Sequence, residues 1–165
     1  MFILQGMCYS GKTTLGSILA REINVPFLDS RDLFQRIHGM SETEYLTSFG
    51  RDKFCEAERE TLKQDFGDIV LSLGGSACYY PSEMDSLAKH HTIIWLDVSF
   101  DEIKKRMEAE GNPRPIVYFG GVESFQQLYE QRRLLYPLYT TIKISVTEAQ
   151  DPTSTIESIL KSIYK

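Results

Sequence analysis

"MFILQGMCYSGKTTLG", residues 1–16, joins three kinds of local sequence in a fixed order. The apolar run at 2–4 is typical of a short buried strand, and helical spacing begins near Thr13. Between them, the stretch starting at Gly6 satisfies G-x-x-x-x-G-K-[ST] in the strand-to-helix context that this motif requires. Its glycines allow successive backbone N–H groups to turn inward, and the helix adds the positive end of its dipole. The stretch predicts a cradle for the phosphates of a nucleotide.

Each side chain of this cradle has an expected role. Lys12 should reach the β- and γ-phosphates, and the Thr13 hydroxyl should ligate Mg²⁺, so ATP and Mg²⁺ are the expected cofactors. A GTPase is disfavoured, because the chain contains neither a D-x-x-G switch nor an N-K-x-D guanine-binding motif. The residues expected to bind the nucleotide here are Gly6, Ser10, Gly11, Lys12, Thr13 and Thr14.

Length and composition bound the remaining possibilities. A chain of 165 residues, 42% hydrophobic and 25% charged, fits a single globular domain spanning 1–165. A net charge of −5 argues against nucleic acid as a partner. Three widely spaced cysteines suggest neither disulfides nor zinc, and no apolar stretch is long enough to span a membrane. We therefore expect a cytoplasmic monomer.

Apolar runs alternate with helical patterns along the chain, which favours a parallel α/β sheet covered on both faces. The expected strands are 2–4, 25–28, 69–73, 92–96 and 142–146. The expected helices are 13–22, 52–66, 100–110 and 152–164. Two segments fit this rhythm poorly, one polar and one rich in proline and glycine. They predict a substrate-binding segment at about 30–60 and a lid at about 110–122.

Five stretches resemble the shikimate kinase family in order and spacing. They are "GMCYSGKTTLGSILAREINVPFLDS" (6–30), "FGRDKFCEAERETL" (49–62), "VLSLGGSA" (70–77), "NPRP" (112–115) and "YPLY" (136–139). The resemblance spans nearly the whole chain. It implies a five-stranded parallel sheet in the order 2-3-1-4-5, flanked by helices, with small substrate-binding and lid segments.

The nucleotide half of the family pattern is intact. By resemblance, Asp29 lies near Mg²⁺, Arg114 is the lid arginine that closes onto the transferred phosphoryl group, and Arg106 and Pro152 flank the adenine. A carboxylate opposite Thr13 also suits a hard cation. Asp29 is equally placed to cap the next helix, and the two roles are compatible.

The acceptor half departs from the family pattern. Arg31 stands where the family has the aspartate that binds the acceptor hydroxyl, and Cys55 and Leu135 stand where it has two carboxylate-binding arginines. Ser76 replaces the third glycine of a G-G-G turn, while Arg132 and Arg133 lie one helical turn from Leu135. The acceptor is expected near Arg31, Asp32, Cys55, Gly74 and Gly75.

Three functions remain open. The first is an ATP-dependent kinase that phosphorylates a hydroxyl of an unidentified small molecule, with Lys12, Asp29 and Arg114 as its catalytic residues. The second is a nucleotide-binding protein of the same fold without kinase activity. The third is a shikimate kinase with a rearranged acceptor site.

Overall fold

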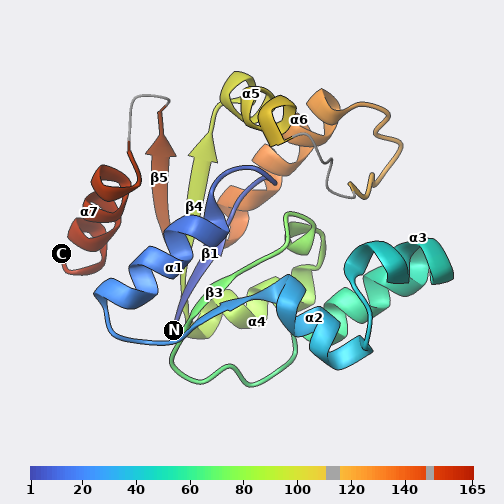
Figure 1. Ribbon diagram of the computed structural model, residues 1–165, viewed down its shortest axis with the longest axis horizontal. Helices are drawn as coiled ribbons and strands as arrows, with labels where there is room; N and C mark the ends of the chain where they lie inside the picture. The colour runs from blue at the N-terminus through green and yellow to red at the C-terminus, as the bar shows by residue number, and fades with distance from the viewer. Residues whose placement is uncertain (111–115, 148–150) are drawn as a thin grey trace.

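Five parallel strands form one sheet in the order β2-β3-β1-β4-β5, in a computed structural model that describes residues 1–110, 116–147 and 151–165 (Figure 1). The sheet order and the parallel pairing expected from the family resemblance are confirmed. The strands are β1 (Phe2–Gln5), β2 (Phe27–Asp29), β3 (Val70–Ser72), β4 (Thr92–Val98) and β5 (Ile142–Val146). The main helices are α1 (Lys12–Glu22), α2 (Ser30–His38), α3 (Glu42–Thr61), α4 (Pro81–His90), α5 (Phe100–Glu110), α6 (Phe125–Leu135) and α7 (Pro152–Ile163). Two short 3-10 turns are η1 (Ala77–Tyr79) and η2 (Tyr136–Tyr139).

The two faces of the sheet are buried in different hydrophobic clusters. Successive residues of a strand point to opposite faces, so Ile3 and Leu4 belong to separate clusters. Leu4 packs in the cluster that contains Leu19 of α1 and Ile159 of α7. Ile3 packs in the cluster that contains Met84 of α4. Burial on both faces explains why the strands read as continuous apolar runs.

Helices α2 and α3 form a separate arm beside the sheet (Figure 1). Gly39 ends α2 in the left-handed conformation, and Ser41 begins α3 with a reciprocal capping box to Glu44. Gly50 interrupts α3 with φ 79° and ψ 175°. The polar segment 30–50, which had no clear helical pattern, is therefore largely helical because its caps define short helices.

Other boundaries also differ from the sequence-based expectation. Helix α3 ends at Thr61, and α4 was not predicted. Strand β2 begins at Phe27, two residues later than expected. Pro26 has no N–H for the ladder, and its carbonyl accepts a hydrogen bond from Val70 N at 2.9 Å. Within the described residues, no helix combines the length and hydrophobicity needed to cross a membrane.

Gly16 marks the tightest contact between α1 and the sheet. A Cβ at this position would lie 2.5 Å from Cε2 of Phe27 and 3.0 Å from Cδ1 of Leu4. We expect Gly16→Ala to lower the free energy of unfolding by about 1–3 kcal/mol through overpacking, although alanine normally favours a helix. Thermal unfolding followed by circular dichroism measures the change. Ser17→Ala, on the exposed side of the same helix, should leave the Tm equal or slightly higher, and equal Tm values for the two variants would contradict the expectation.

Candidate active site

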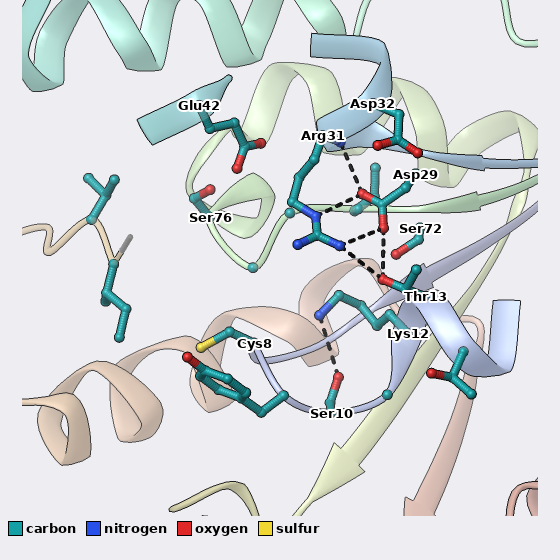
Figure 2. A pocket seen from close by; sticks show the side chains of 18 of the residues that line it. Cys8, Ser10, Lys12, Thr13, Asp29, Arg31, Asp32, Glu42, Ser72 and Ser76 are labelled. Carbon is teal, nitrogen blue, oxygen red and sulfur yellow. Dashed lines mark hydrogen bonds and ion pairs between the residues drawn. The ribbon is translucent and has the colours of Figure 1, made fainter. Parts of the chain in front are cut away.

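The loops that follow β1, β2 and β3 meet at one edge of the sheet, around a cavity of about 740 Å³. This edge receives the carboxyl ends of all the parallel strands, where sites in α/β folds form. One side of the cavity is lined by the loop between β1 and α1, and the other by α2, α3 and the turn after β3. Figure 2 shows that Lys12, Thr13, Asp29 and Arg31 lie together between these two sides.

The loop between β1 and α1 has the backbone that the sequence motif predicts. Gly6 has φ 145° and Gly11 has φ 90°, and a Cβ on Gly6 would lie 2.8 Å from the carbonyl oxygen of Leu96. The ammonium group of Lys12 donates to the carbonyl oxygens of Gly6 at 2.9 Å and Met7 at 2.6 Å, and contacts Ser10 Oγ at 3.4 Å. The lysine is therefore folded onto the loop in this structure.

Asp29 caps α2, which is one of its two predicted roles, and its carboxylate also contacts the first turn of α1. Its Oδ1 accepts from the backbone N–H of Arg31 at 3.0 Å, and its Oδ2 accepts from Thr13 Oγ1 at 2.7 Å. Burial alone would raise the pKa of Asp29, but the hydrogen bonds from Arg31 and Thr13 hold it below its ordinary value. Asp29 is therefore an ionised carboxylate at neutral pH.

The Asp29–Thr13 pair suits Mg²⁺ by donor chemistry, because both groups offer hard oxygen ligands. Within the described residues, no cluster of three or more His, Cys, Asp or Glu side chains could hold a metal by itself. Mg²⁺ commonly binds through one or two protein groups together with phosphates and water. The residues present thus fit a metal held jointly by this pair and a nucleotide.

Arg31 also occupies this centre, which the sequence did not predict. Its Nε and Nη2 donate to Asp29 at 3.1 Å each, and Nη2 donates to Thr13 Oγ1 at 3.2 Å (Figure 2). The hydrogen bond to Asp29 raises the pKa of Arg31 further above its ordinary value. A permanent cation thus lies beside the carboxylate of Asp29 and the hydroxyl of Thr13.

Two of the three other residues predicted for the nucleotide side line the cavity, and the third lies outside the described residues. Arg106 of α5 donates from Nη1 to the carbonyl of Tyr9 at 3.2 Å, and from Nε to Glu102 at 2.6 Å. Arg106 and Pro152 both line the cavity. Arg114 belongs to 111–115, outside the described residues, so the lid arginine remains a sequence-based expectation.

The side of the cavity lined by α2, α3 and the turn after β3 is where the sequence predicts the acceptor, and we call it the acceptor side. A buried carboxyl group there accepts hydrogen bonds from two hydroxyls. Ser76 Oγ donates to Glu58 Oε1 at 2.6 Å, and the Tyr80 hydroxyl donates to Oε2 at 2.5 Å. Burial raises the pKa of Glu58 above its ordinary value, although these hydrogen bonds and the charge of Arg132 act to lower it. Asp32, Gly74 and Gly75 line the cavity, whereas Cys55 does not line it and packs instead against two hydrophobic clusters.

The two adjacent arginines of α6 have different environments. Arg132 is 4% exposed and lines the cavity, while Arg133 pairs with Asp97 on the surface at 3.1 Å. Arg132 donates to the carbonyl of Val117 at 3.2 Å, and its guanidinium lies 5.4 Å from the ring centre of Tyr79. Its buried Nε has no hydrogen-bond partner, and it forms no ion pair with a carboxylate in the described part of the chain. Arg132 is therefore a buried cation available to an anionic ligand.

Glu42 is a cavity residue that sequence reasoning missed. It is half-buried at the start of α3, and its carboxyl group points toward the space between Arg31 and Ser76 (Figure 2). Burial raises the pKa of Glu42 to about 8, and the carboxyl of Glu58 adds to the rise, while Arg31 opposes it. A polar residue just after a serine N-cap gives no sequence signal beyond the cap itself.

A glycine-rich loop with the P-loop motif follows the central strand of this sheet, and helices α2 and α3 lie across one cavity from it. This arrangement defines a P-loop kinase fold. The shikimate kinase family model matches residues 9–164, and the chain belongs to that family. A shikimate kinase from Synechococcus elongatus is 31% identical over 163 residues, covering 97% of this chain and 84% of the relative. The solved structure of shikimate kinase from Aquifex aeolicus covers 99% of this chain, with a TM-score of 0.80, 28% sequence identity and 96% of that chain covered. The structure of shikimate kinase from Acinetobacter baumannii in complex with shikimate also covers 99% of this chain, with a TM-score of 0.86, 24% sequence identity and 92% of that chain covered.

The raised pKa of Glu42 predicts a pH-dependent loss of stability. Its ordinary pKa is 4.5, so between about pH 4.5 and about pH 8 the folded state retains a proton that the unfolded chain releases. As the pH rises through this window, the free energy of unfolding of the parent protein should fall relative to that of Glu42→Gln, and the difference should level off above it. Between pH 4.5 and pH 8 the free energy of unfolding of the variant should rise by at least about 1 kcal/mol relative to the parent.

Urea unfolding at a series of pH values measures this gain. The control is Glu60→Gln, which lies on the exposed side of the same helix and should track the parent at every pH. Parallel stability curves for Glu42→Gln and the parent would show that Glu42 ionises normally in the folded protein.

Proposed function

We propose that this protein transfers the γ-phosphoryl group of ATP to a hydroxyl of a small anionic molecule. The observation that carries the proposal is the continuity of one cavity, which is lined on one side by Lys12 and Thr13 and on the other by Arg132. Family membership supports a kinase-like function. Phosphoryl transfer depends mainly on positioning and charge stabilisation, which such a cavity supplies.

The nucleotide side binds the phosphates through the loop N–H groups and Lys12. Exchange of the lysine contacts to Gly6 and Met7 for β- and γ-phosphate oxygens places a cation at the developing charge. Thr13 and Asp29 would hold Mg²⁺, which would offset the negative charge of the phosphates. Arg106 and Pro152, which line the same cavity, flank the adenine in this proposal.

The acceptor side anchors an anion through Arg132. A carboxylate or phosphate there would pair with the guanidinium and supply the missing partner of Nε. A Cβ on Gly75 would lie 2.8 Å from Nη1 of Arg132, so glycine leaves room for this side chain beside the turn. Arg132 would thus take the place of the two family arginines replaced by Cys55 and Leu135.

The proton of the acceptor hydroxyl needs a base, and the family aspartate is replaced by Arg31. As the acceptor oxygen bonds to the γ-phosphorus and ADP leaves, Glu42 can accept that proton when ionised. Its pKa of about 8 lies close to physiological pH, which suits a general base. Asp32 is a further carboxylate that lines the acceptor side of the cavity.

The first test measures ADP release from Mg·ATP with and without shikimate, the acceptor named for the relatives. We expect acceptor-dependent turnover, and Lys12→Ala should reduce it at least about 100-fold by removing phosphate charge stabilisation. If shikimate gives no turnover, other hydroxylated carboxylates and phosphates are tested in the same assay. ATP binding without turnover on any acceptor would favour a nucleotide-binding protein that has lost kinase activity.

The two neighbouring arginines of α6 give a matched test of the anion anchor. Arg132→Gln should raise the acceptor KM about 10- to 100-fold while ATP affinity stays near that of the parent. Arg133→Gln removes the same charge from the surface and should leave both values unchanged. Steady-state kinetics together with Tm values separate a binding defect from a folding defect. Equal acceptor KM values for the two variants would remove Arg132 from the acceptor site.

A further inference from the structure

The carboxylate of Asp29 has all of its acceptor positions occupied by protein donors. Oδ1 accepts from the backbone N–H and Nε of Arg31, and Oδ2 accepts from Nη2 of Arg31 and Oγ1 of Thr13. These four hydrogen bonds match the four lone-pair sites of a carboxylate. Arg31 supplies three of the four, two of them from its guanidinium.

A metal ion, or a water bound to one, therefore finds no free lone pair on Asp29 while Arg31 stays in place. Thr13 is also engaged, because its hydroxyl donates to Asp29 and accepts from Arg31 Nη2. A divalent cation beside the guanidinium would in addition meet like-charge repulsion. The donors suit Mg²⁺ in kind, but the guanidinium already holds them.

The Arg31 side chain can leave without disrupting α2. It is 42% exposed, whereas the side chain of Asp29 is 5% exposed. The capping bond from the backbone N–H of Arg31 does not depend on the guanidinium, so the helix keeps its N-cap when the side chain swings away. The arginine is thus an exchangeable partner of a fixed carboxylate.

We propose that the Arg31 guanidinium and a divalent cation are alternative partners of the Asp29–Thr13 pair. The inference rests on the proposed binding of ATP in the adjoining cradle. Without metal, Arg31 presents the protein's own positive charge to the terminal phosphates. With metal, the guanidinium is released from Asp29 toward the acceptor side of the cavity. Mg²⁺ therefore adds less to ATP affinity here than it would without Arg31.

The experiment measures the Kd of mant-ATP by fluorescence, once in EDTA and once in excess Mg²⁺. The ratio of the Kd in EDTA to the Kd in Mg²⁺ reports how much the metal contributes to binding. Arg31→Gln should raise this ratio about three- to tenfold over the parent, because it weakens metal-free binding and frees Asp29 for the metal. The control Arg36→Gln removes the same charge from the exposed side of α2 and should leave the ratio unchanged.

Circular dichroism is used to check that each variant is folded. If Arg31→Gln does not fold, Arg31→Lys replaces it, with a smaller rise in the same direction because lysine lacks the planar fork. Equal ratios for the parent and the Arg31 variant, with mant-ATP bound, would overturn the inference and leave the proposed function standing. No mant-ATP binding in either condition would overturn both.

Discussion

The parallel pairing of β1 with β3 and β4 is the constraint on which the site depends. Because the strands run the same way, the phosphate-binding loop, Asp29 and the Gly74–Gly75 turn all emerge at one edge of the sheet. Burial of Ile3 and Leu4 in clusters on opposite faces fixes this register, since a slip of one residue would exchange the two faces. The helices then cover the faces and leave that edge open.

Charged groups of both signs lie close together within the cavity. Arg31 pairs with Asp29, and the buried Arg132 of α6 lines the acceptor side. Burial raises the pKa of Glu58 and the pKa of Glu42, and the carboxyl of Glu58 adds to the rise at Glu42. With a pKa of about 8, Glu42 is largely protonated at neutral pH, so the acceptor side is less negative than its composition implies.

The family resemblance implied the sheet order. The turn between β1 and α1 was predicted from its glycines, Lys12 and the strand-to-helix context, because these constrain the backbone directly. The acceptor side was harder, because it depends on which way single side chains point. Both Arg132 and Arg133 were candidates, and only packing against the turn after β3 separates the buried one from its exposed neighbour. No motif surrounds Glu42, so its place in the cavity follows only from the folded structure. Helix α4 was not predicted because no helical periodicity was recognised in its sequence.

The pairing of Glu58 with Ser76 and Tyr80 bears on how the wall of the cavity is held together. Here both oxygens of Glu58 already accept hydroxyl protons. Glu58 is buried, so loss of either hydroxyl would leave a carboxyl oxygen without its partner and without ready access to water. These two hydrogen bonds therefore act as a noncovalent cross-link in the cavity wall, fastening helix α3 to the turn after β3 and to the residue that begins α4.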